Sequence, residues 1–227
     1  MKLVHKFEYN KLEREEDKFG GRKYITPDGN KVSSVTTILD KTKPAEAAAA
    51  LLGWQKNIGT KKSTEITTEA AARGTIMHSF LEKHLRGENP KLGTNIFHKP
   101  SYNMAEIIME TYIRPNLSEI WGLEVSLFYP EIYAGTTDCV GVYNGIDSIV
   151  DFKQTNKPKT DERVLDYKLQ LSAYALAHDI IHESSIKQGV ILMCSKDLNP
   201  QAWILNEDDL NMYKNYWWAR VAQYYKV

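Results

Sequence analysis

The sequence predicts an α/β fold in which helices flank one mixed sheet, with a small N-terminal lobe over residues 1–64 and the main core over 65–227. Three observations predict it. β-Branched residues alternate with small or polar ones around Asp138, and Asn144-Gly145 follows as a tight hairpin signal before the second strand, 146–153. An amphipathic helix and an apolar strand come next, so that strands and helices alternate along the chain.

The first lobe combines short strands with one good helix. Pro44 suits the first turn of a helix rich in alanine, in which Trp54 is more simply a core residue than a base-stacking platform. The expected elements are a solvated helix or frayed arm over the charge run 11–18, a strand over 24–26, a turn over 27–30, a strand or strand-to-helix entry over 32–39, a helix over 45–58 and a loop over 59–64.

The core begins with two helices. Thr67 or Thr68 can cap the first helix, which should end near Arg86 because Gly87 follows it. The remaining expected elements are a helix over about 102–121, a strand over 123–133, the hairpin, a helix over 161–182, a strand over 186–194, an edge strand over 202–205 and a final helix capped by Asn206.

The hairpin brings three charged side chains together. Asp151 and Lys153 project to one face of their strand about 7 Å apart, and the antiparallel return places Asp151 close to Asp138. Such carboxylates suit Mg²⁺ or Mn²⁺, which can polarise a phosphodiester, and a lysine beside them can stabilise the charge that develops. The D-x-K pattern alone is weak, since a sheet-edge hairpin with solvated charges has the same composition.

Other elements are expected to complete this site. Gln170 and Tyr174 are four residues apart, so they share a helix face, where they can hold a phosphate or the lysine; a core helix with a half-buried tyrosine is the simpler alternative. His78 lies off the apolar stripe of its helix and can bind a metal, although a lone histidine is more often structural. Glu124 is a further acidic candidate, on a strand that should pair with that of Asp138.

Composition narrows the class of protein. No apolar run approaches the length of a membrane span, and the N-terminus lacks an apolar signal core, which favours a cytoplasmic protein of a bacterium or phage-infected host. Cys139 and Cys194 read as reduced core residues and cannot supply the four ligands of an iron–sulfur cluster.

Charge indicates at most a local contact with nucleic acid, because 29 basic and 29 acidic residues give a net charge of zero. One candidate stripe consists of Lys153, Lys157, Lys159, Arg163 and Lys168. A solvated helix start with interleaved acidic residues explains that stripe equally well.

The ordered motifs resemble those of a known nuclease superfamily. Gly135–Asp138 (G-T-T-D), Asp151–Lys153 (D-F-K) and Gln170–Tyr174 (Q-L-S-A-Y) are similar to the motifs of PD-(D/E)XK nucleases in their RecB-like branch. Ser34–Leu39 (S-V-T-T-I-L) and Arg73–Glu82 (R-G-T-I-M-H-S-F-L-E) extend the resemblance over most of the chain, in particular to the family of mitochondrial genome maintenance exonucleases and their phage relatives. The resemblance implies a restriction-endonuclease-like core of order αβββαβ. The chain departs from it at Gln154, where members more often carry a small hydroxyl residue.

The residue patterns and the resemblance together assign a role to each candidate residue. The metal ligands would be His78, Asp138, Asp151 and the backbone carbonyl of Phe152, with Glu124 assisting and Lys153 activating water. The substrate-binding residues would be Gln170, Tyr174, Arg73, Thr75, Ser34, Thr36, Thr37 and Lys157.

We therefore expect a Mg²⁺- or Mn²⁺-dependent exonuclease that hydrolyses single-stranded DNA from its ends, in replication, repair or recombination. Hydrolysis follows from the candidate site, while the preference for ends and single strands follows from the resemblance. Two alternatives stay open. One is a metal-dependent endonuclease or the nuclease module of a recombination complex, and the other is a catalytically silent nucleic-acid-binding protein of the same fold, against which the intact D-x-K argues.

Overall fold

A mixed β-sheet forms the centre of the computed structural model, which describes residues 1–16, 18 and 20–227. Its strands follow the order β2-β3-β4-β6-β7-β8-β9, and β5 pairs with both β6 and β1. The strands are β1 Lys2–Leu3, β2 Glu13–Glu16, β3 Arg22–Ile25, β4 Lys31–Ser34, β5 Leu117–Tyr129, β6 Tyr133–Tyr143, β7 Ile146–Thr155, β8 Gln188–Ser195 and β9 Pro200–Leu205.

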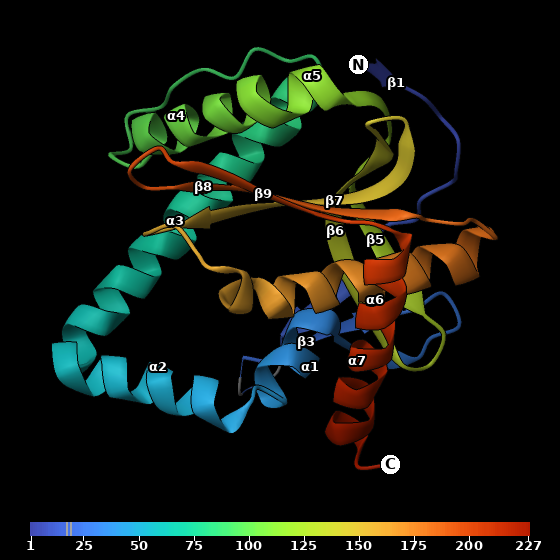
Figure 1. Cartoon of the computed structure of the whole chain (residues 1–227), viewed down its shortest axis with the longest axis horizontal. Helices are drawn as coiled ribbons and strands as arrows, with labels where there is room; N and C mark the ends of the chain where they lie inside the picture. Colours follow the sequence, from blue (N-terminus) through green and yellow to red (C-terminus); the bar gives the residue numbers. More distant parts are fainter. Residues whose placement is uncertain (17, 19) are drawn as a thin grey trace.

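Helices cover both faces of this sheet, with α3 and α4 on one side and α6 and α7 on the other (Figure 1). The helical segments are α1 Val35–Lys41, α2 Ala45–Ile58, α3 Thr60–Leu85, α4 His98–Ile108, a π-helical turn Met109–Ile113, α5 Arg114–Asn116, a 3₁₀ turn Asp161–Val164, α6 Leu165–His182 and α7 Glu207–Tyr225. The predicted fold class is confirmed, and the order helix, three strands, helix, strand runs from α3 to β8, with α4 and α5 inserted between α3 and the first of these strands.

Alternation along the central strands explains why both faces are covered. On β7, Ile149 packs with the α6 and α7 side while Val150 packs with the α3 and α4 side. On β8, Ile191 and Leu192 divide in the same way. Successive strand residues point to opposite faces, so a continuous apolar run buries only when helices lie on both of them.

The predicted hairpin forms between β6 and β7. Asn144 and Gly145 have φ angles of 52° and 79°, the left-handed values that a two-residue hairpin turn of this kind requires. The turn sets the register, which runs from Tyr143 opposite Ile146 to Cys139 opposite Val150.

Beyond Cys139 the sheet divides. On one edge β6 pairs with β5 over its whole length. On the other edge it pairs with β7 only over Cys139–Tyr143 and with β4 only at Tyr133 and Ala134. β7 instead continues beside β8 as far as Thr155. Residues 135–138 of β6 therefore line a gap between β4 and β7, which we call the fork.

Several predicted boundaries were wrong. The expected loop 59–64 is helical, because the chain reverses at Gly59 (φ 83°) and α3 begins directly afterwards at Thr60. The helix expected to reach residue 121 ends at Asn116, because β5 already pairs with the end of β6 from Leu117 onward. The charge run forms β2 beside β3 rather than a helix or arm, and its residue Asp17 lies outside the described part.

Other predicted local features are present. The segment 32–39 is a strand that leads into a helix at Ser34, and Asn206 caps α7 through a reciprocal capping box with Asp209. Cys139 and Cys194 are free, buried strand residues. Among the described residues, the helices include none that combines the length and apolar character needed to cross a membrane.

Candidate active site

Asp138 lies in the fork, where the ladder between β6 and β7 ends. Its Oδ2 accepts the backbone N–H of Phe152 at 2.5 Å, and its Oδ1 lies 3.0 Å from Nδ1 of His78. Since Cys139 pairs with Val150, the next opposed pair would be Asp138 and Asp151. The Asp138 carboxylate thus satisfies a strand N–H that the divided ladder leaves without a backbone acceptor, and it is only 11% exposed.

Glu124 and His78 approach Asp138 from β5 and α3. The register places Glu124 opposite Asp138, because Leu123 pairs with Cys139 and Val125 with Thr137. One ligand atom each from His78, Glu124 and Asp138 lie within 4.8 Å of one another. Glu124 also has a φ of 52°, a conformation that is uncommon for residues other than glycine and that clusters at functional sites.

Asp151 and Lys153 form an ion pair on β7, as their shared strand face predicts. Asp151 is 2% exposed, and its Oδ2 is the oxygen that contacts the Lys153 ammonium group. The Lys153 Nζ lies 5.1 Å from the centre of the Tyr167 ring. Sequence reasoning gave Tyr167 no functional role, because an aromatic residue near an inner helix stripe is indistinguishable from a core residue.

Crowding of the carboxylates shifts their pKa values. Partial burial and the adjacent Asp138 raise the pKa of Glu124 to about 7, and burial raises that of Asp151 to about 6 against the opposing effect of Lys153. Burial also favours a raised pKa for Asp138, but His78 and Lys153 outweigh it, and the pKa of Asp138 is lowered. The site therefore contains more potential negative charge than its own cations neutralise, a condition that a bound cation relieves.

The two cationic groups respond in the opposite sense. Burial lowers the pKa of His78, but the Asp138 carboxylate outweighs burial, so its pKa is raised. Burial likewise lowers the pKa of Lys153, and Asp151 and Asp138 together reverse the effect, so its pKa is raised as well. Lys153 is therefore a firmly charged ammonium group within the fork.

Gln170 and Tyr174 support the fork from α6. Gln170 Nε2 donates to Tyr174 Oη at 3.0 Å, and both residues are buried. The Tyr174 ring lies against Gly135 of the fork, where a Cβ atom would stand 2.6 Å from Tyr174 Cε1. Burial, followed by the charge of Asp151, raises the pKa of Tyr174, so the phenol stays protonated.

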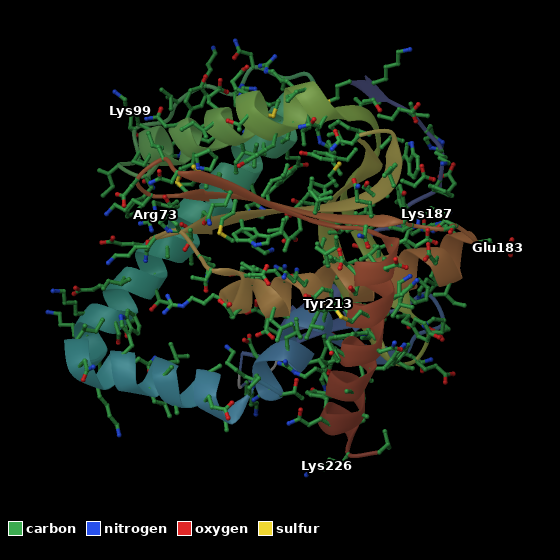
Figure 2. The ribbon with its side chains drawn as sticks, in the orientation of Figure 1. Arg73, Lys99, Glu183, Lys187, Tyr213 and Lys226 are labelled. Atoms are coloured by element: carbon green, nitrogen blue, oxygen red, sulfur yellow. The ribbon has the colours of Figure 1, made fainter. Side chains whose placement is uncertain are left out.

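The residues of the R-G-T motif on α3 differ in their exposure to solvent. Arg73 is buried and bonds to Asn156 in the loop after β7, where α3 passes the end of that strand (Figure 2). Thr75 is exposed. Gly74 allows close approach to β7, since a Cβ there would lie 3.3 Å from Cγ of Gln154. Gln154 Nε2 donates to the carbonyl of Ala70 at 2.8 Å, so the residue that departs from the family pattern ties α3 to β7.

The hydroxyl-rich segment after β4 is largely internal. Ser34 caps α1 by accepting the N–H of Thr37 at 3.0 Å, and Thr37 Oγ1 accepts the N–H of Arg22 at 2.8 Å. Thr36 lines the groove described below, and Lys157 is exposed in the loop after β7. Of these four predicted contacts, only Thr36 and Lys157 therefore present side chains at an open surface.

Two clefts reach the candidate site from different sides. The first, which we call the α2 groove, has a volume of about 750 Å³ and lies between α1 and α2 on one side and the start of α6 on the other; its lining includes Lys43, Trp54, Lys159, Arg163, Tyr167 and Gln170. Trp54 is 37% exposed, so its interpretation as a core residue was wrong. The second, which we call the Glu124 cleft, has a volume of about 770 Å³, and its lining includes Lys11, Arg14, Tyr24, Glu82, Glu124 and Thr136.

The arrangement fits a divalent cation. It offers two carboxylates and one imidazole within 4.8 Å, and the buried Asp151 carboxylate beside them has Lys153 as its charged partner. Oxygen ligands suit Mg²⁺, and an added imidazole suits Mn²⁺ better.

Comparison with known proteins supports a nuclease similar to the mitochondrial genome maintenance exonucleases. No protein-family model matches the chain. Proteins named mitochondrial genome maintenance exonuclease 1 are similar over 86% of this chain: 28% identical over 204 residues in Mus musculus, 28% over 210 in Xenopus tropicalis and 26% over 205 in Homo sapiens. The chain covers 58–59% of the length of these curated relatives. A solved structure from Eubacterium rectale, provisionally titled an exonuclease, aligns over 68% of each chain with a TM-score of 0.42 and 15% identity.

Proposed function

We propose that residues 1–227 form one metal-dependent exonuclease domain that hydrolyses single-stranded DNA from its ends. The observation that carries the proposal is the convergence of His78, Glu124 and Asp138 in the fork beside the Asp151–Lys153 pair. This combination places ligands for a divalent metal ion next to the Lys153 ammonium group, and both a metal ion and an ammonium group can stabilise the negative charge that develops in phosphodiester hydrolysis.

The proposed ligands are His78, Asp138 and Asp151, with Glu124 close enough to assist. The Phe152 N–H faces Asp138, and the N–H and C=O of one strand residue point to the same edge of the strand. We therefore expect the Phe152 carbonyl to face the fork as a further ligand. A divalent cation held there would polarise the phosphodiester and lower the pKa of a water.

Lys153 is proposed to act through its charge. Asp151 and Asp138 keep its pKa raised, so it is unsuited to accept a proton and suited to stabilise negative charge on the phosphoryl oxygens and to orient the attacking water. Tyr174 and Gln170 hold the floor of the fork, and Gln170 also reaches the α2 groove.

The α2 groove is the proposed path of the nucleic-acid strand. Apolar residues of α2, among them Leu51 and Trp54, face the basic residues Lys159 and Arg163 across it. Such a pairing suits a single strand, whose bases stack on apolar and aromatic side chains while its phosphates meet cations. The names of the similar proteins support action at ends and on DNA.

Two single-stranded DNAs of equal length test this function. One is linear and labelled at an end or internally, and the other is circular and labelled internally. We expect degradation of the linear strand with Mg²⁺ or Mn²⁺, survival of the circle and no hydrolysis with excess EDTA. Cleavage of the circle would favour the endonuclease alternative. Binding without hydrolysis at any metal concentration would favour the silent nucleic-acid-binding alternative.

A further inference from the structure

Arg220 lies on α7 and hydrogen-bonds to two other helical elements, the end of α1 and the start of α6. It is 9% exposed. Its Nε donates to Thr42 Oγ1 at 2.6 Å, and its Nη2 donates to the Leu39 carbonyl at 2.7 Å. Its Nη1 donates to Asp166 Oδ1 at 3.2 Å. The first two acceptors belong to the end of α1 and the third to the first turn of α6.

The two elements that Arg220 connects, the end of α1 and the start of α6, both line the α2 groove. Leu39 and Lys43 line the groove at the end of α1, while Asp166 and Tyr167 line it from α6. A guanidinium group is planar and always charged, so it can donate in both directions at once with fixed geometry. The last carbonyls of α1 carry partial negative charge, which favours a cation there.

The position of α2 depends on the same contacts. None of its residues is buried, so packing contributes little to its placement, and in Figure 1 it stands apart from the sheet. Its first end continues from α1 through Thr42 and Pro44, and its second end turns at Gly59. Where α1 ends therefore determines where α2 begins over the groove.

We propose that Arg220 is a positioning residue that sets the width of the α2 groove. The claim that it matters for a nucleic-acid strand rests on the proposed function, whereas the claim that it holds the two walls together does not. Without Arg220 the end of α1, and the unburied α2 that follows it, is less firmly held relative to α6, so a long substrate loses contacts while a substrate too small to span the groove is unaffected.

Steady-state kinetics of Arg220→Met test this role. We expect the KM for a single-stranded oligonucleotide to rise about tenfold or more, because charge-assisted hydrogen bonds to both walls are lost. The kcat on that substrate and the hydrolysis of bis(p-nitrophenyl) phosphate should stay close to wild type. Arg220→Lys, which keeps the charge without the fork-shaped donor set, should give an intermediate KM.

Lys214→Met is the matched control. Lys214 also links α7 to α6, through Asp179 at 3.7 Å, but Asp179 lies near the other end of α6 and outside the groove lining. We expect its KM for the oligonucleotide to be unchanged. An unchanged KM in folded Arg220→Met, or equal losses on the oligonucleotide and the small diester, would overturn the positioning role.

A distance measurement separates this inference from the proposed function. Spin labels at Leu51→Cys and Glu162→Cys, on opposite walls, report the groove width, while the native Cys139 and Cys194 are buried. Pulsed electron paramagnetic resonance should give a narrow distribution in the parent protein and a broader, longer one with Arg220→Met. A widened groove in a protein that hydrolyses no DNA would refute the proposed function alone, and an unchanged distribution would refute this inference alone.

Two milder variants cover the case in which Arg220→Met does not fold. Thr42→Val removes one acceptor on the α1 side, and Asp166→Asn weakens the acceptor on the α6 side. Each should broaden the distance distribution, and Thr42→Val, which leaves the charge of the groove unchanged, should also raise the KM for the oligonucleotide. If both variants match the parent protein in distance and in KM, Arg220 has no positioning role.

Discussion

The carboxylate of Asp138 accepts the backbone N–H of Phe152 at 2.5 Å, at the position where β6 and β7 separate. One oxygen of the side chain is thereby held by the sheet, and the other faces His78. A carboxylate fixed in this way needs little reorganisation to receive a ligand, which is the condition for strong electrostatic effects in an active site.

Asp151→Asn should abolish metal-dependent hydrolysis while the fold is retained. Asparagine has nearly the same shape but replaces an anionic ligand with a neutral amide, which binds Mg²⁺ poorly. Nuclease assays and calorimetric Mn²⁺ titration should show both losses. Asp147→Asn, on the same strand but 43% exposed and paired with Lys6, is the control that should behave as wild type. Wild-type rates in Asp151→Asn would remove this residue from the site.

Lys153→Met should separate transition-state stabilisation from metal binding. The variant keeps the aliphatic stem but loses the ammonium group, so single-turnover rates should fall about 10²- to 10³-fold. Metal affinity, measured by calorimetry, should not fall. Lys187→Met, which removes an exposed lysine beside Glu207, is the control. Loss of metal binding with the rate retained would reverse the roles assigned to Lys153 and the carboxylates.

His78→Ala should weaken Mn²⁺ binding more than Mg²⁺ binding, because imidazole is the better ligand for Mn²⁺. A loss of about tenfold or more in Mn²⁺ affinity is expected for removal of a ligand. His84→Ala, on the same helix but paired with Glu106, should leave both affinities unchanged. Unchanged titrations with both metals for His78→Ala would assign this part of α3 a structural role only.

Metal affinity should rise as the pH rises from about 5.5 to about 8. Asp151 and Glu124, with pKa values of about 6 and about 7, are protonated below those values, and protons then compete with the cation. Calorimetry in buffers of different ionisation enthalpy should show protons released on Mn²⁺ binding. Glu124→Gln should make the pH dependence shallower. An affinity independent of pH across this range would contradict the raised pKa values.

Gly135→Ala should destabilise the fold by about 1–3 kcal/mol, because the new methyl group enters the space of the Tyr174 ring. The same substitution in a Tyr174→Ala background should cost less, and urea unfolding of the four proteins measures this coupling. Gly53→Ala, with open space around it in α2, is the control and should not destabilise. Additive effects of the two changes would show that Gly135 and Tyr174 do not constrain each other.

Features set by neighbouring residues could be predicted from the chain alone. Asn144-Gly145 predicted a two-residue turn, and this turn fixes which residues of β6 and β7 lie opposite each other. Strand alternation then placed Asp151 and Lys153 on one face. Element ends were less predictable, because Leu117 joins β5 only through pairing with Tyr143, which lies on a different strand.

Relations between separate elements required the folded chain. Strand periodicity and turn chemistry act over a few residues, so they specify the hairpin and its carboxylates wherever the hairpin packs. The approach of His78 to Asp138, the burial of Arg73 and the exposure of Trp54 depend on how whole helices settle against the sheet. Arg220 shows the same limit, since its three acceptors come from α1 and α6 and meet only when α7 packs against both. Local sequence preferences do not predict such contacts, because the free energy that selects them comes from burying the complete core.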